Sequence, residues 1–217
     1  AFSDFHIYMY DTDIAEISNS TFNGAYYGVY SRKTAGEYTN NQFIDQRSSG
    51  YSVYLSYGES TDDSSDLTSV FEGNTFTKSS SNGSGIRCIY GGQIELKEDN
   101  FTDFNGTYAM YLDSCSSEVE EVEFTNLGGA ITFAYDGNHE WESITADGVG
   151  LSGFSSYMAY FYPFSGPMNL SVTDSSFVNI GSSSSSMTGL YASTYSPSSN
   201  PINLTVSDTT YSGGGTG

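Results

Sequence analysis

The chain contains 217 residues, of which 37% are hydrophobic, and it is rich in Ser, Gly, Thr and Tyr but poor in the usual helix formers. This composition favours strands, because Tyr, Phe, Thr and Val suit a pleated sheet. Six Lys and Arg residues against 26 Asp and Glu residues give a formal net charge of −20. That charge argues against nucleic acid as a partner, and no apolar run approaches the roughly 18 residues of a membrane-spanning helix.

A short motif recurs along the chain, in which an aromatic residue follows a polar, turn-like stretch. The aromatic positions are Phe22, Phe43, Phe76, Phe101, Phe124, Phe177 and Tyr211. Five residues before them stand Ile17, Tyr38, Phe71, Leu96, Val119, Val172 and Val206. We expect a degenerate copy over 144–149, with Val149 in the aromatic position.

A second column of apolar residues lies between the copies, where each member opens a short strand. Its members are Ile7, Val29, Val53, Ile86, Met110, Ile131, Met158 and Leu190, spaced by 21 to 33 residues. A repeat this short cannot bury its own apolar face, so equivalent strands must pair from coil to coil, about 4.8 Å apart. The pattern predicts an all-β, single-domain parallel β-helix of about eight coils over 1–211, followed by a Gly-rich tail over 212–217.

Two short motifs point to a known group. The segment Phe71-Glu72-Gly73-Asn74 matches the Phe-x-x-Asn motif of the polymorphic outer-membrane protein repeats, and Gly128-Gly129-Ala130-Ile131 matches their Gly-Gly-Ala-Ile motif. The chain therefore resembles these repeats, within the right-handed, pectate-lyase-like parallel β-helix superfamily. The repeat pattern covers nearly the whole chain, and each short motif occurs once in full. The resemblance implies a right-handed helix and a role at a cell surface.

Strand alternation places the residue after each member of the second column on the outside. With Arg87, Thr132 and Ala159 as interruptions, this predicts a broken tyrosine ladder. Its members are Tyr8, Tyr30, Tyr54, Tyr111 and Tyr191. Three interpretations stay open: simple strand preference, a protein interface, or a platform for sugar rings. Protein contact is favoured over sugar because tyrosine is enriched at protein interfaces.

Acidic residues recur six positions before the aromatic residue. They place Glu16 beside Glu37 and Glu95 beside Glu118, with Ser143 in the degenerate copy. Like charges on adjacent strands repel one another. A Ca²⁺ ion shared by Glu95 and Glu118 would offset that repulsion, although a salt-screened acidic face is the favoured interpretation. No other cofactor is expected.

Cysteines and glycosylation acceptors bear on the compartment. Cys88 and Cys115 are 27 residues apart while the local coil has 24, so a disulfide and a buried free thiol at Cys88 both stay open. Six Asn-x-Ser/Thr triplets begin at Asn19, Asn82, Asn100, Asn105, Asn169 and Asn203. Such triplets carry glycans in secreted eukaryotic proteins, so we expect an extracellular or cell-surface glycoprotein.

No catalytic set is recognisable. The pair Asp62-Asp63 lacks the second carboxylate that a glycoside hydrolase needs, and we interpret it as part of a loop. The segment Asn138-His139-Glu140-Trp141 mixes an imidazole, a carboxylate and an indole, but we expect it to form a turn between coils. The sequence therefore favours a protein that is not an enzyme.

Neither terminus offers a polar cap for a solenoid, since the chain enters and leaves through apolar strands. The end coils must then be covered by further chain or by another subunit. We expect a non-catalytic structural or adhesive glycoprotein that self-assembles into a surface filament or appendage, such as a flagellar hair. The alternative is a β-helix that binds glycans or cleaves polysaccharides.

Overall fold

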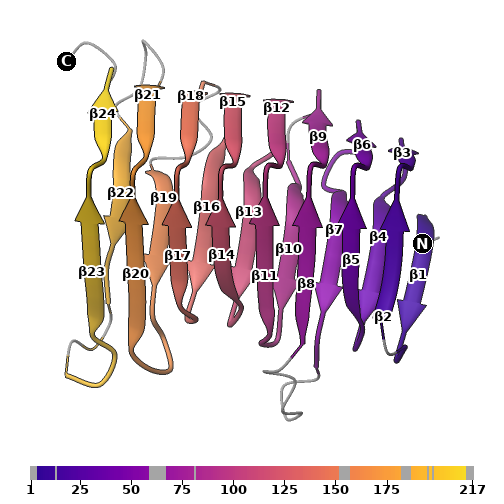
Figure 1. The fold of residues 1–217 in the computed structure, drawn as a ribbon, viewed down its shortest axis with the longest axis horizontal. Coiled ribbons are helices and arrows are strands. Elements are labelled where there is room, and N and C mark those ends of the chain that lie inside the picture. Colours follow the sequence, from indigo (N-terminus) through magenta and orange to yellow (C-terminus); the bar gives the residue numbers. More distant parts are fainter. Residues whose placement is uncertain are drawn as a thin grey trace.

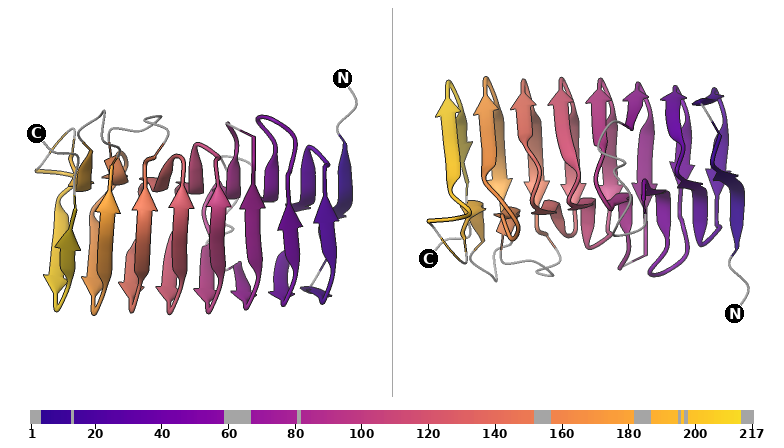
Figure 2. Two further views of the ribbon diagram at one scale, coloured as in Figure 1. Left: turned by 90° about the horizontal axis from the view of Figure 1, so that it is seen from above. Right: turned by 90° about the horizontal axis from the view of Figure 1, so that it is seen from below.

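The computed structural model describes residues 4–12, 14–58, 67–80, 82–151, 157–181, 187–194, 196 and 198–213. Their strands form three parallel sheets of eight strands each, and successive strands along the chain belong to successive sheets. The coils stack along one axis in chain order (Figure 1), and the two further views show the same regular spacing (Figure 2). This arrangement confirms the predicted single-domain parallel β-helix of about eight coils.

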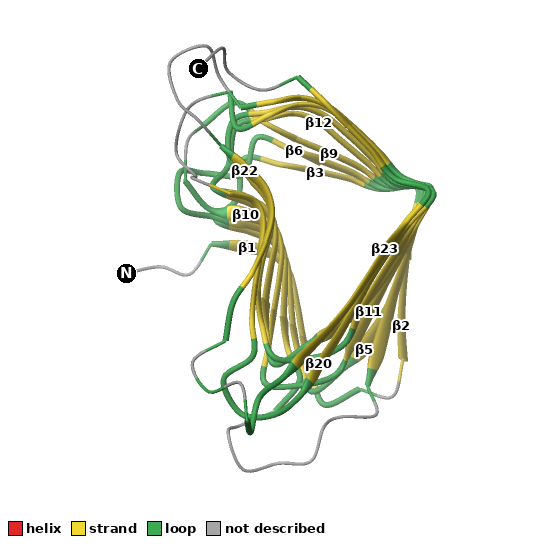
Figure 3. Ribbon diagram, turned by 90° about the vertical axis from the view of Figure 1, so that its left-hand side faces the viewer, coloured by secondary structure: helices red, strands yellow, loops and turns green. Residues whose placement is uncertain are grey.

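The three sheets are the three walls of the solenoid (Figure 3). Sheet A contains β1 (Phe5–Tyr10), β4 (Tyr27–Arg32), β7 (Tyr51–Ser56), β10 (Ser84–Ile89), β13 (Tyr108–Asp113), β16 (Ala130–Tyr135), β19 (Tyr157–Tyr162) and β22 (Thr188–Ala192). Sheet B contains β2 (Ile14–Ser18), β5 (Ala35–Thr39), β8 (Thr68–Glu72), β11 (Gln93–Lys97), β14 (Ser116–Glu120), β17 (His139–Glu142), β20 (Met168–Thr173) and β23 (Ile202–Ser207). Sheet C contains β3 (Thr21–Asn23), β6 (Gln42–Ile44), β9 (Thr75–Lys78), β12 (Asn100–Phe104), β15 (Glu123–Leu127), β18 (Thr145–Val149), β21 (Ser176–Ile180) and β24 (Thr210–Ser212).

A file of stacked aromatic rings runs through the core along sheet C. The first five members are Phe22, Phe43, Phe76, Phe101 and Phe124. Their ring centroids lie 4.4 to 5.1 Å apart, and the rings are close to parallel. The predicted aromatic column is thus confirmed. Each ring covers the face of the next, so this wall of the core is closely packed.

The degenerate coil was predicted wrongly in one respect. Ala146, and not Val149, pairs with Phe124 and continues to Phe177, while Val149 pairs with Leu127. The residue five before Ala146 is Trp141, which is buried in the next column. The large indole of Trp141 in one column compensates in volume for the small side chain of Ala146 in the other. Because neither residue matches the usual pattern, the sequence motif could not be recognised correctly in this coil.

The register of sheet A also differs from the prediction at two positions. Met110 pairs with Thr132 and not with Ile131, and Leu190 pairs with Ala159 and not with Met158. In these strands two consecutive residues before the outward aromatic side chain are buried. Strict alternation of buried and exposed residues fails at that point. The prediction therefore placed Ile131 and Met158, which hold the first buried position, in the column that Thr132 and Ala159 occupy.

The turn from sheet B to sheet C has the same length in every coil. Its first residue adopts a left-handed conformation with φ between 49° and 65°, at Asn19, Asn40, Gly73, Glu98, Glu121, Ser143, Asp174 and Asp208. Asn, Asp and Gly tolerate this conformation best. The constant turn forms the sharp corner of the solenoid (Figure 3) and keeps the registers of sheets B and C in step.

The longer loops that connect consecutive strands lie at the other corners of the solenoid. Asp62-Asp63 falls outside the described residues. In the described part of the chain, no helix is long and apolar enough to cross a membrane.

Candidate functional site

The outer face of sheet A carries a nearly continuous aromatic ladder. In register order its positions are Tyr8, Tyr30, Tyr54, Arg87, Tyr111, Phe133, Tyr160 and Tyr191. The predicted interruptions at Thr132 and Ala159 are wrong, because both side chains are fully buried and Phe133 and Tyr160 point outward instead. Seven of these eight positions are therefore aromatic.

The rings of the ladder stack face to face. Centroids of neighbouring rings lie 4.5 to 5.9 Å apart, with interplanar angles of 6° to 25°. Each ring covers the faces of its neighbours, so the ladder presents ring edges to an approaching molecule. A sugar ring stacks on an open aromatic face, so the closed ladder is a poor platform for glycans along most of its length.

Arg87 replaces an aromatic rung without breaking the stack. Its guanidinium lies 5.4 Å from the ring centroid of Tyr54 and 5.0 Å from that of Tyr111, which are its neighbours in register. It also lies 5.3 Å from the ring of Tyr51 and donates a hydrogen bond of 2.7 Å to the Tyr51 hydroxyl. Cation–π contacts of this kind are attractive. Burial raises the pKa of Tyr54 to about 12, so its hydroxyl stays neutral at physiological pH.

Two further outward columns flank the ladder and add to its aromatic character. The first contains Phe5, Tyr27, Tyr51, Ser84, Tyr108 and Ala130. The second contains Tyr10, Arg32, Ser56, Ile89, Asp113, Tyr135 and Tyr162. Across these paired positions and the ladder the charged residues are Arg32, Arg87 and Asp113. The face is thus nearly free of the charge that dominates the protein.

The outer face of sheet B is acidic in contrast. Its outward positions include Glu16, Glu37, Glu72, Glu95, Glu118, Glu120, Glu140 and Glu142. Glu140, and not Ser143, pairs with Glu118, so three glutamates follow one another in adjacent coils. Lys97 forms an ion pair of 3.4 Å with Glu120. The net charge of −20 is therefore unevenly spread, and sheets A and B present chemically different surfaces.

A side-chain amide bridges the two glutamates proposed as a Ca²⁺ site. The Nε2 atom of Gln93 donates to Glu95 Oε1 at 3.1 Å and to Glu118 Oε1 at 2.8 Å. This contact offsets part of the repulsion that motivated the metal hypothesis. Among the described residues, no group of three or more His, Cys, Asp or Glu side chains is placed to hold a metal ion. A Ca²⁺ ion at this pair stays the alternative to the favoured salt-screened acidic face.

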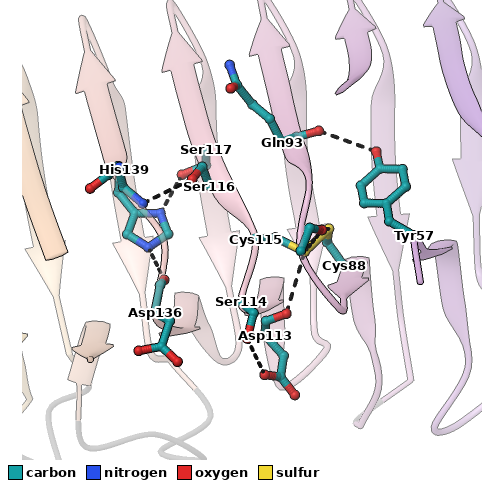
Figure 4. The surroundings of a disulfide bond; sticks show 12 residues. Tyr57, Cys88, Gln93, Asp113, Ser114, Cys115, Ser116, Ser117, Asp136 and His139 are labelled. Atoms are coloured by element: carbon teal, nitrogen blue, oxygen red, sulfur yellow. Dashed lines mark hydrogen bonds between the residues drawn. A yellow bond between two sulfur atoms is a disulfide. The ribbon is translucent and has the colours of Figure 1, made fainter. Parts of the chain in front are cut away.

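Cys88 and Cys115 form a disulfide with their Cα atoms 6.1 Å apart (Figure 4). Cys88 lies in β10 and pairs in register with Leu112 of the next coil. After Asp113 the chain turns toward sheet B, and this turn brings Cys115 back to Cys88. The offset of three residues is thus absorbed by the corner of the solenoid. Both cysteines are fully buried, and the bond joins two successive coils.

The six glycosylation acceptors all reach the surface at least in part. Asn19, Asn82, Asn169 and Asn203 are exposed, and Asn100 and Asn105 are half-buried. Asn169 and Asn203 pair in register on adjacent strands. Their side chains form a polar ladder with Asn138, through hydrogen bonds of 2.9 and 3.0 Å. No sequence signal pointed to Asn138 as the third member, and occupancy by glycans stays a prediction.

The segment around His139 is a strand, so the predicted turn is wrong. His139 and Trp141 of β17 point into the core, while Glu140 points outward. Burial lowers the pKa of His139 to about 4, so the imidazole is neutral. Its Nε2–H donates to the Asp136 carbonyl at 3.0 Å, so Nδ1 accepts from the Ser117 hydroxyl at 2.9 Å (Figure 4). This Ser–His pair is sealed in the core and acts as a structural contact between coils.

Comparison with models of known protein families, with curated protein sequences and with solved structures found no match. The assignment of the chain as a parallel β-helix therefore depends on its own strand pairing.

Proposed function

We propose that this protein is a non-catalytic, extracellular structural or adhesive β-helix whose copies assemble end to end into a surface filament or appendage. The observation that carries the proposal is the exposed apolar end of the solenoid. Leu204, Val206 and Tyr211 of the last described coil are 48%, 45% and 44% exposed. Their register partners one coil earlier, Leu170, Val172 and Phe177, are almost completely buried.

The opposite end offers unpaired strand edges. In the described part of the chain, β1, β2 and β3 each pair on one side only, as do β22, β23 and β24. Unpaired strand edges recruit further strands. Stacking a second copy in the same register would bring Val206 toward Ile17 and Tyr211 toward Phe22. Ile17 and Phe22 are only 9% and 5% exposed, so the contact would be made mainly by the unpaired strand edges and the exposed residues of the last coil. A head-to-tail contact of this kind does not close, and it produces a filament.

Other features support an extracellular setting. Disulfides persist mainly in oxidising compartments, and the Cys88–Cys115 bond joins two coils in the middle of the solenoid. The acidic face of sheet B, with glycans on the surface asparagines, would keep an assembled filament hydrated. The aromatic face of sheet A would then serve for lateral or adhesive contacts, because aromatic side chains are enriched at protein interfaces. We also propose that the chain is a member of the pectate-lyase-like superfamily.

Sedimentation velocity over a concentration series tests the end-to-end contact. The unmodified chain should form larger species as its concentration rises. The double variant Leu204→Lys/Val206→Lys should stay monomeric, because it would bury charge at the junction. The matched control Thr205→Lys/Ser207→Lys changes the outward positions of the same strand and should still assemble.

Association that is unchanged by Leu204→Lys/Val206→Lys would place the contact elsewhere. A monomer at every concentration would rule out end-to-end assembly of this chain. Assays for reducing sugars and unsaturated uronates should show no turnover of polysaccharides, and turnover would support the enzymatic alternative.

A further inference from the structure

One rung is missing from the aromatic columns of sheet A. Ser84 of β10 pairs in register with Tyr51 on one side and with Tyr108 on the other. In the same column, Tyr27 and Tyr51 stack with their ring centroids 5.7 Å apart. No ring fills the corresponding space at Ser84, which is itself only 3% exposed; the Arg87 guanidinium lies 5.3 Å from the Tyr51 ring, and a hollow of about 260 Å³ remains beside it. We call this hollow, lined by Tyr51, Ser84 and Tyr108, the Ser84 slot.

The dimensions of the slot correspond to one flat ring. Two strand spacings separate the backbones that carry Tyr51 and Tyr108, about 9.6 Å in total. A ring inserted halfway would lie about 4.8 Å from each tyrosine, which is within the range of stacking distances in the neighbouring ladder. The volume is also sufficient, since a cavity of about 150 Å³ accommodates benzene. The slot therefore leaves ring-sized space between two tyrosines at the position of the missing rung.

Polar groups border the slot on the sides that the rings leave open. Arg87 lies beside it, held by its hydrogen bond to the Tyr51 hydroxyl. The Nε atom of Arg87 is buried and has no hydrogen-bond partner. Thr107 also lines the hollow. An aromatic ring in the slot would lie between the two tyrosines and close to the guanidinium, which is attracted to π systems.

We propose that the Ser84 slot binds an aromatic side chain, a Tyr or Phe ring presented by a protein partner, which completes the missing rung. A flat ring is favoured over a sugar because it stacks on both walls at the spacing of the ladder. This proposal rests on the adhesive role proposed above and specifies the group that the outer face of sheet A would bind. It does not depend on end-to-end assembly, so the two can fail separately.

Ligand-observed NMR with the 217-residue chain tests the slot. The probes are p-cresol, the side-chain analogue of tyrosine, and a Gly-Tyr-Gly peptide with blocked termini, with methyl glucoside as the sugar arm. We expect both aromatic probes to bind with a Kd on the order of 1 mM. The variant Ser84→Tyr fills the slot from within and should weaken binding at least tenfold. The matched control Thr188→Tyr changes an outward residue of β22, four coils away, and should bind like the unmodified chain.

A second variant covers the case in which Ser84→Tyr does not fold. Tyr108→Leu removes one wall of the slot and should also weaken both aromatic probes at least tenfold. Equal binding to the unmodified chain and to either folded slot variant would overturn the proposal, as would no binding of the aromatic probes. Tighter binding of methyl glucoside than of p-cresol, lost in Ser84→Tyr, would assign the slot to a glycan instead.

Discussion

Replacing Asp99 by Asn is expected to stabilise the protein, and by more at alkaline than at acidic pH. Asp99 belongs to a buried ladder at the turn from sheet B to sheet C. In this ladder Asn41 and Asn74 donate their side-chain amides to the carbonyls of Ile17 and Tyr38, at 2.7 and 2.8 Å. Asp99 accepts from the backbone and side chain of Asn74 through Oδ1, at 2.6 and 2.8 Å. Its Oδ2 atom is buried without a hydrogen-bond partner.

The magnitude follows from the titration of this carboxyl. Burial raises the pKa of Asp99 from its ordinary value of 3.8 to about 7, against the opposing hydrogen bonds from Asn74. Between these pH values the folded state retains a proton that the unfolded state has released. Stability therefore falls as pH rises from about 4, and the loss is complete above about 7. It amounts to about 4 kcal/mol, since a tenfold change in the dissociation constant corresponds to about 1.4 kcal/mol.

An Asn at position 99 would supply a neutral amide donor, as Asn41 and Asn74 do at the equivalent positions of the preceding coils. Urea unfolding at pH 5 and pH 8 measures the effect. The variant should exceed the unmodified protein in unfolding free energy by several kcal/mol at pH 8 and by clearly less at pH 5. The control is Asp174→Asn, at an exposed residue of an equivalent turn, where the replaced carboxyl is not buried. A gain that is equal at both pH values, or a variant less stable at pH 8, would refute the reasoning.

Three further predictions concern the core and the surface. Phe101→Ala should lower the unfolding free energy by about 3–5 kcal/mol in urea titrations, because it opens the aromatic file between Phe76 and Phe124, and a loss below 1 kcal/mol would show that the file is not close-packed. Reducing the Cys88–Cys115 bond, which spans 27 residues, should lower it by about 3.5 kcal/mol, and unchanged denaturation after verified reduction would contradict this. A chelator should leave the melting temperature unchanged, because Gln93 already bridges Glu95 and Glu118, whereas a drop that added Ca²⁺ reverses would reveal a shared cation.

The architecture could be predicted from the sequence because one column of large rings repeats with little variation. Phe76, Phe101 and Phe124 mark the same corner of successive coils, and the short turn before them has constant length. Any loop inserted elsewhere leaves this marker intact. The fold therefore followed from the spacing of a few aromatic residues.

The register of sheet A could not be predicted as well, for a local reason. Ile131 and Thr132 are both buried, so hydrophobicity did not reveal which of them pairs with Met110. Because the predicted register was shifted by one residue, it placed Thr132 and Ala159 on the outer face, where the structure has Phe133 and Tyr160. The continuous ladder was consequently interpreted as a broken one.

Contacts that depend on three-dimensional neighbours were also beyond the sequence. The bridge from Gln93 to two glutamates joins adjacent coils, and the Ser84 slot depends on which residues pair with Ser84. The disulfide was left open because a count of residues along straight strands does not include the corner that returns Cys115 to Cys88.

Electron microscopy of the concentrated native chain tests the central claim most directly. Eight coils at about 4.8 Å each give a subunit length of about 38 Å along the axis. End-to-end stacking predicts filaments with an axial repeat near this value and with strands perpendicular to the filament axis. Isolated monomers at the highest concentration, or assemblies whose repeat does not match the length of one solenoid, would contradict the account.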